Sequence, residues 1–112
     1  MNPESYVAQH CFDKGSKLIR IDSSEKQTYV EHILDGLKED NVCIQGNNYR
    51  ILGVWAYDDG TSMTYFYWNN GEPDGNGPKQ IVLKRTEGSS ILHWDDVSIP
   101  MKSTCTYVCE IR

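Results

Sequence analysis

The chain has 112 residues, which suits one compact domain spanning residues 1–112. Charged residues make up 24% of it and the formal net charge is −5, with lysines and arginines scattered, so it lacks the basic stripe that nucleic-acid binding requires. No apolar run approaches the roughly 20 residues of a membrane helix and the N-terminus does not resemble a signal peptide, so we expect a soluble module, whole or a fragment, without membrane insertion.

The N-terminal segment predicts a helix and then a short strand. Asn2 is placed to act as the N-cap, Pro3 takes the first helical position, and Gly15 ends the helix. His10 has no second ligand at a metal-binding offset, so we interpret it as a helix-face residue beside the core. The apolar run from Leu18 to Ile21 predicts the strand.

A second helix is predicted after this strand. Asp22 to Glu25 has the cap-x-x-Glu spacing that opens a helix, and Gly36 marks its end within a residue or two. Five apolar residues between them recur at helical spacing and predict one buried stripe. These are Tyr29, Val30, Ile33, Leu34 and Leu37. His32 falls off the stripe, so we interpret it as part of a solvated polar face.

The rest of the chain alternates polar loops with runs of strand character. The polar segment from Lys38 to Asn48 is predicted as a loop, and Asp58 to Gly60 as a turn. The predicted strands are residues 50–55, 80–84, 91–94 and 104–111. The aromatic run from Tyr65 to Trp68 is compatible with sugar stacking, but we favour ordinary strand packing with alternate rings buried.

The four cysteines favour disulfides. They are Cys11, Cys43, Cys105 and Cys109, and their spacing alone does not choose among three pairings. Zinc binding lacks paired ligand spacing, and nothing marks a cysteine nucleophile with a histidine and an orienting partner. Disulfides imply an oxidising, secreted or extracellular location. Free buried thiols at Cys43 and Cys105 remain an alternative.

Two acidic segments carry the candidate metal ligands. The stretch from Trp68 to Gly77 is rich in glycine and asparagine and predicts an exposed loop. It holds Glu72 and Asp74 on either side of a proline, while Asp95 and Asp96 follow a predicted strand. Ca²⁺ takes six to eight oxygen ligands, and these four carboxylates suit it if the fold brings them together. The alternative is a solvated acidic turn and an acidic strand end.

Six short motifs follow one another along nearly the whole chain. They are Ala8 to Cys11, Gly15 to Glu25, Ile51 to Val54, Glu72 to Asp74, Trp94 to Asp96 and Tyr107 to Glu110. In this order they resemble the C-type lectin domain family, whose signatures at three of these places are Trp-Ile-Gly-Leu, Glu-Pro-Asn and Trp-Asn-Asp. The resemblance implies an α+β fold with two helices flanking small antiparallel sheets and a long loop region.

The resemblance also implies the covalent and ligand-binding features of the chain. It pairs Cys11 with Cys109, which leaves Cys43 with Cys105, and it places a cis peptide bond before Pro73. The implied calcium ligands are Glu72, Asp74, Asp95 and Asp96. The implied carbohydrate contacts are Glu72, Asp74 and Asp95, at which a sugar's two neighbouring hydroxyls would coordinate the ion.

The ligand motifs depart from the family pattern. Asp74 and Asp95 stand where the family usually has asparagine, and an ionised aspartate cannot donate a hydrogen bond. A bound hydroxyl would lose up to two hydrogen bonds, each worth about 0.5 to 1.5 kcal/mol, so we expect weak or altered sugar selectivity. The family has a further glutamate ligand after the loop, and this chain has Lys79 or Gln80 at about that position, which removes one carboxylate. We expect cation binding to survive better than sugar recognition.

The chain also departs from the family in its scaffold. The region before the Glu-Pro-Asp loop is shortened. The two positions at which the family has the cysteines of its second disulfide are occupied here by an apolar pair, Ile81 and about Met101. The family's domain usually opens with a strand before the first helix, and this sequence starts at the helix, so either it is a fragment or the strand has been lost. A lost strand would leave the strand from Thr104 to Ile111 with an unpaired edge, which favours a homodimer through that edge or poor solubility.

Two functions remain after these steps. The first is a secreted, calcium-dependent carbohydrate-binding module, or lectin. The alternative is an interaction domain of the same fold that binds protein, ice or a mineral surface, with calcium structural or absent. We do not expect an enzyme, because carboxylates clustered as metal ligands would not hold the raised pKa of a general acid, and no nucleophile and base pair is visible.

Overall fold

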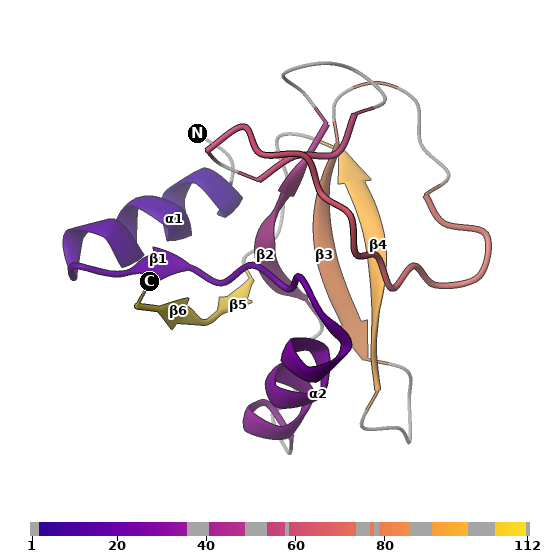
Figure 1. The fold of residues 1–112 in the computed structure, drawn as a ribbon, viewed down its shortest axis with the longest axis horizontal. Coiled ribbons are helices and arrows are strands. Elements are labelled where there is room, and N and C mark those ends of the chain that lie inside the picture. Colours follow the sequence, from indigo (N-terminus) through magenta and orange to yellow (C-terminus); the bar gives the residue numbers. More distant parts are fainter. Residues whose placement is uncertain are drawn as a thin grey trace.

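The computed structural model describes residues 3–35, 41–48, 54–57, 59–73, 77, 79–85, 91–98 and 105–111. Several predicted features lie outside these residues, namely Asn2, Gly36, Leu37, residues 50–53, Asp58, Asp74 and Met101. The described residues form two helices and two small sheets, which confirms the predicted α+β class (Figure 1). Neither helix is long and apolar enough to cross a membrane.

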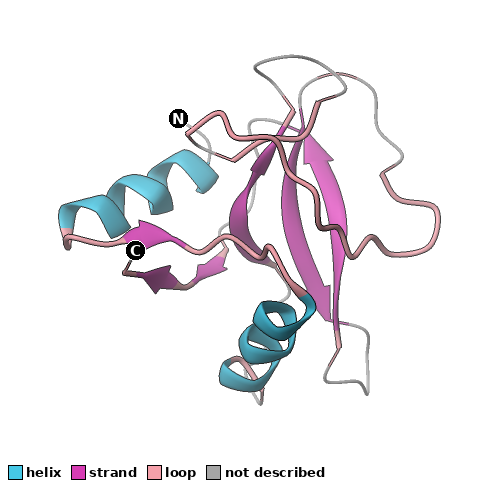
Figure 2. Cartoon of the chain, viewed as in Figure 1, coloured by secondary structure: helices cyan, strands magenta, loops and turns pink. Residues whose placement is uncertain are grey.

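The elements follow one another in a simple order. They are α1 (Pro3–Asp13), β1 (Lys17–Leu18), α2 (Ser24–Ile33), β2 (Val42–Asn47), β3 (Lys79–Arg85), β4 (Leu92–Ser98), β5 (Thr106–Tyr107) and β6 (Cys109–Glu110). One sheet has the strand order β4-β3-β2-β5, with β5 parallel to β2, and β1 pairs with β6 in the other. The long loop region between β2 and β3 runs beside β4 (Figure 2).

Helix α1 ends where the glycine signal predicts. Gly15 has a positive φ of 76°, a conformation that glycine adopts without a steric penalty, and its N–H donates to the carbonyl of Phe12 (2.9 Å). His10 lies partly buried on this helix, where its Nδ1 and the Tyr107 hydroxyl share a hydrogen bond. The side chain therefore links α1 to β5, in keeping with its interpretation as a helix-face residue beside the core.

The buried face of α2 differs from the predicted stripe. Val30 and Leu34 are buried, but Tyr29 and Ile33 are 55% and 38% exposed. The third inward residue is polar Gln27, whose side chain hydrogen-bonds to the neighbouring strand. The prediction was wrong because it counted only apolar residues, whereas a polar side chain with partners can occupy a buried helix position.

The start of α2 also lies one residue later than predicted. Ser23, rather than Asp22, is the N-cap, and its hydroxyl accepts a hydrogen bond from the backbone N–H of Lys26 (3.2 Å). Serine and aspartate are similarly good caps, so the spacing to Glu25 did not choose between them. Asp22 is exposed before the helix.

Strand β2 overturns the prediction of a loop from Lys38 to Asn48. Residues 42–47 form a strand that lies between β3 and β5 and is buried along its whole length. Its polar residues misled the prediction, although they have partners inside the fold. Gln45, for example, donates from Nε2 to the carbonyl of Leu18 (2.7 Å) and from its backbone N–H to Ile19 (2.9 Å).

The hairpin-like pair β3 and β4 is confirmed and extends further than predicted. Its register runs without interruption from Lys79 opposite Ser98 to Arg85 opposite Leu92. Asp95 and Asp96 therefore lie within β4, not beyond its end. The larger core cluster packs against this pair, with Trp94 completely buried.

Two disulfides join the termini and the central strand. Cys11 and Cys109 connect α1 to β6, and Cys43 and Cys105 connect β2 to the residue before β5. The first is the pairing that the family resemblance implies, and the second joins the two cysteines that this pairing leaves. The predicted C-terminal strand is interrupted at Val108, because β5 pairs with β2 while β6 pairs with β1. A homodimer through the edge of this strand stays a prediction.

Candidate functional site

The loop that carries Glu72 is anchored to the edge strand β4. The backbone N–H of Asn69 donates to the carbonyl of Trp94 (2.9 Å), and the N–H of Trp94 donates to the carbonyl of Tyr67 (3.1 Å). A turn follows, in which the N–H of Glu72 donates to Asn69 (3.0 Å), and the bond between Glu72 and Pro73 is cis, as the resemblance implies. The loop thus reaches β4 next to its two aspartates.

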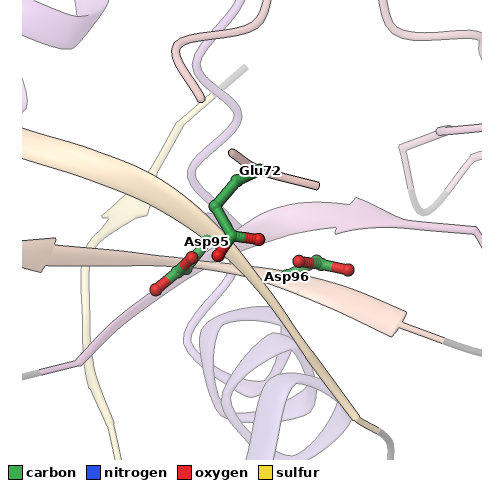
Figure 3. Close-up of side chains that lie close together, drawn as sticks. All are labelled: Glu72, Asp95 and Asp96. Carbon is green, nitrogen blue, oxygen red and sulfur yellow. The ribbon is translucent and has the colours of Figure 1, made fainter. Parts of the chain in front are cut away.

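Three of the four predicted carboxylates come together. One oxygen each from Glu72, Asp95 and Asp96 lies within 4.8 Å of the others. In Figure 3 the Glu72 carboxylate comes from the loop and lies between those of the two aspartates of β4. Asp96 is buried, with 8% of its surface exposed, while Glu72 and Asp95 are partly buried.

The chemistry of these donors fits a calcium-type cation. Calcium binds oxygen ligands at about 2.3 to 2.6 Å, so two oxygens that share one ion lie up to roughly 5 Å apart. The separations among Glu72, Asp95 and Asp96 stay within this limit. Three clustered carboxylates also repel one another, and a divalent cation would relieve that repulsion. When bound, such an ion would supply open coordination positions for ligand hydroxyls.

The remaining sequence-predicted positions add no carboxylate among the described residues. Asp74 lies outside them. Lys79 begins β3, with its backbone N–H donating to Oδ1 of Asn48 (2.7 Å). Gln80 is completely buried, and within the described part of the chain neither Nε2 nor Oε1 of its side chain has a hydrogen-bond partner. The place expected for the family's further glutamate therefore holds a cationic lysine and a neutral glutamine instead of a carboxylate.

Sequence reasoning missed one charged neighbour of the site. The ammonium of Lys84 on β3 lies 3.5 Å from Oδ2 of Asp95 on β4. The two residues are eleven positions apart, and no motif in the sequence connects them. Only the register of β3 against β4 places them at diagonal positions of one sheet face.

The aromatic run before the loop does not pack as an alternating strand. Tyr65 and Trp68 pack edge-on against Trp94, with ring centroids 5.9 and 6.0 Å away. Phe66 and Tyr67 are neighbours in the sequence, yet each is 36% exposed. The interpretation as alternately buried strand residues was wrong, because this segment is an irregular loop that runs alongside β4. Sugar stacking on the two exposed rings stays a hypothesis.

Comparison with known proteins identifies the fold family. The chain is 32% identical over 112 residues to a C-type lectin of Micrurus corallinus, and the match covers 98% of this chain and 70% of the relative. The chain belongs to the C-type lectin family. It is also 30% identical over 103 residues to a C-type lectin mannose-binding isoform of Oxyuranus scutellatus, covering 90% of this C-type lectin chain but only 64% of that relative. No family model matches the sequence.

Solved structures of the C-type lectin fold superpose on most of the chain. The carbohydrate-recognition domain of the mouse scavenger receptor C-type lectin has a TM-score of 0.76 at 21% identity, over 96% of this chain and 81% of that one. A calcium-independent type II antifreeze protein has a TM-score of 0.68 at 23% identity, over 89% of this chain and 72% of that one. The C-type lectin fold is therefore compatible with sugar recognition and with antifreeze proteins that do not use calcium.

Proposed function

We propose that this chain is a secreted, calcium-dependent carbohydrate-binding module. The observation that carries the proposal is the convergence of Glu72, Asp95 and Asp96 within 4.8 Å at the place where the loop meets β4. Relatives named C-type lectins support the carbohydrate class, and two disulfides support an oxidising compartment.

Each carboxylate has a distinct part in this proposal. Glu72, Asp95 and Asp96 would hold Ca²⁺, and Asp74 would complete the ligand set. Bound calcium would supply coordination positions for two neighbouring hydroxyls of a sugar, and the carboxylates of Glu72, Asp74 and Asp95 would accept hydrogen bonds from those hydroxyls. We propose no catalytic activity, because these carboxylates would stay ionised as metal ligands and would not act as general acids.

The first experiment is a calcium-dependent change in stability. The thermal midpoint of the oxidised chain should rise in excess calcium relative to chelator, because a ligand at a hundredfold excess over its Kd stabilises the folded state by about 2.7 kcal/mol, or roughly 10 °C here. Asp96→Asn should abolish the rise. Asp22→Asn, which removes the same charge from an exposed position before α2, should keep it.

Sugar binding is tested separately from calcium binding. A panel of immobilised glycans should retain the wild-type chain in calcium and release it in chelator, while Asp96→Asn should not bind in either condition. Binding that persists in chelator, or no binding despite a clear calcium-dependent rise in the thermal midpoint, would contradict the carbohydrate proposal.

A second candidate function is an interaction domain that does not depend on the carboxylate cluster. The structural similarity to a calcium-independent antifreeze protein favours it. In this case calcium would be structural or absent, and the partner would be a protein, ice or a mineral surface. Thermal hysteresis and surface adsorption would then be equal for the wild type and Asp96→Asn, whereas loss of partner binding in a folded Asp96→Asn variant would count against this candidate.

A further inference from the structure

An ion pair joins the carboxylate cluster to the neighbouring strand. Nζ of Lys84 lies 3.5 Å from Oδ2 of Asp95, which is one of the three clustered carboxylates. The Lys84 side chain is 48% exposed and the Asp95 side chain 19%. The lysine therefore reaches the cluster from its solvent side while the aspartate is held within the fold.

The sheet register fixes the backbone positions from which the two side chains meet. Asp95 lies opposite Val82, and Lys84 lies opposite His93, so the two charged residues are diagonal neighbours on one sheet face. The ladder between β3 and β4 is continuous over seven pairs. The backbones of Lys84 and Asp95 cannot move apart without breaking that ladder, although the lysine side chain can rotate into solvent.

The charge of Lys84 acts in opposite directions on the two states of the site. Without a metal ion, the ammonium offsets part of the mutual repulsion of Glu72, Asp95 and Asp96 and so stabilises the cation-free form. A divalent cation held by Asp95 would share that carboxylate with the ammonium, and like charges would repel. The calcium-bound form is destabilised by the same lysine.

We propose that Lys84 is a built-in competitor of calcium, which lowers the calcium affinity of the site and raises the calcium concentration at which the site fills. The inference rests on the proposed function and deepens it, because it assigns the regulation of the same site to a residue outside the family motifs. Calcium binding turns the Lys84 side chain out of its ion pair, and removal of calcium restores the pair.

The test is a calorimetric calcium titration of three lysine variants at low ionic strength, where screening is weak. Lys84→Met should bind calcium about two- to fivefold more tightly than the wild type, the range expected for a half-exposed ion pair. Lys84→Arg keeps the charge and should bind as the wild type does. Lys14→Met removes the same charge from the exposed turn after α1, across the molecule from β4 (Figure 1), and is the matched control.

A second measurement separates competition from a general effect on folding. In chelator, Lys84→Met should unfold at a lower urea concentration than Lys14→Met, because Asp95 loses its ion pair and the carboxylate cluster loses a nearby positive charge. In saturating calcium the order should reverse. A role in folding alone would lower the urea midpoint equally in both conditions.

The outcomes distinguish this inference from the proposed function. Equal calcium affinity of Lys84→Met and Lys14→Met, or weaker binding by Lys84→Met, overturns the role of Lys84 while leaving a calcium site intact. Calcium binding by Lys84→Met alone, with none by the wild type, supports the competition. If neither folded protein binds calcium, the proposed function and this inference fail together.

Discussion

At the scale of single residues, the charge of Asp95 limits how the proposed site could contact a sugar. An asparagine there could both coordinate calcium and donate an N–H to a sugar hydroxyl, whereas an ionised aspartate only accepts. Asp95 also pairs with Lys84, which occupies one side of its carboxylate. Both features reduce its value as a sugar contact, which explains why we expect weak binding.

Asp95→Asn should therefore strengthen glycan binding at saturating calcium. One regained hydrogen bond of about 0.5 to 1.5 kcal/mol corresponds to roughly a two- to tenfold lower Kd. Calcium affinity should fall at the same time, because one negative ligand is lost. Titration of a bound glycan at saturating calcium measures the first effect, and unchanged or weaker glycan binding would argue against a direct sugar contact at this position.

Asp59, outside the carboxylate cluster, makes an acid-sensitive contact through local hydrogen bonds. The pKa of Asp59 lies well below its ordinary value, chiefly because Thr61 donates backbone and side-chain hydrogen bonds to it, with a smaller effect from Arg20. Because the pKa of Asp59 is lower in the folded state than in the unfolded state, its ionised carboxylate stabilises the fold fully above the ordinary aspartate pKa. This stabilisation is lost as the pH falls from that value toward the folded-state pKa.

The stabilising effect of Asp59 should therefore disappear in acid. The difference in thermal midpoint between the wild type and Asp59→Asn should be full near pH 6 and should shrink as the pH falls below about 4, the ordinary aspartate value. Asp22→Asn serves as the control for an exposed aspartate. A difference that stays constant down to pH 2 would show that the charge of Asp59 is not responsible.

At the scale of elements, polar side chains dock α2 onto β4. The backbone N–H of Leu92 donates to Oε2 of Glu31 (2.9 Å), and Gln27 makes two further bonds. Gln27 donates from Nε2 to the carbonyl of Leu92 (2.7 Å), and its Oε1 accepts from Nε1 of Trp94 (2.8 Å). Both bonds are buried. Because β4 carries Asp95 and Asp96, the helix supports the strand from which two of the three clustered carboxylates project.

Gln27→Ala should destabilise the fold by about 1 to 3 kcal/mol, because it leaves buried polar groups of Leu92 and Trp94 without partners. Urea unfolding followed by tryptophan fluorescence measures the change. Gln9→Ala on the exposed face of α1 removes the same side chain and should change stability by less than about 0.5 kcal/mol. Equal effects of the two substitutions would mean that the buried network contributes little.

At the scale of the whole molecule, two disulfides hold segments that are distant in the sequence. Cys11 and Cys109 are 98 residues apart, and Cys43 and Cys105 are 62 residues apart. Loop-closure entropy grows only with the logarithm of loop length, so both cross-links should restrict the unfolded chain to a similar extent. They compensate for a core that is limited by the size of a 112-residue chain.

Removing either disulfide by a pair of serine substitutions should lower the free energy of unfolding by about 2 to 5 kcal/mol. Cys11→Ser with Cys109→Ser and Cys43→Ser with Cys105→Ser should have similar effects, measured as urea midpoints of the oxidised proteins. A loss much below 1 kcal/mol for either pair would contradict a structural role for that bridge.

The sequence alone was enough to predict the fold family and to name the three carboxylates that cluster in the structure. Its motifs occur in family order, Gly15 marks the end of α1, the capping spacing placed the start of α2 to within one residue, and β3 and β4 have clear strand character. Local patterns succeed for such features because helix ends and strands depend on neighbouring residues. The residues named for the metal site, apart from Asp74 outside the described region, lie together in the structure.

Only the tertiary structure decided where the polar residues are buried and which charges meet. The sequence predicted a loop where β2 crosses the core and an apolar stripe where Gln27 docks α2, because a buried polar side chain cannot be recognised without its distant partner. The pairing of Lys84 with Asp95 depends on the register of two strands, which the sequence near each residue does not specify.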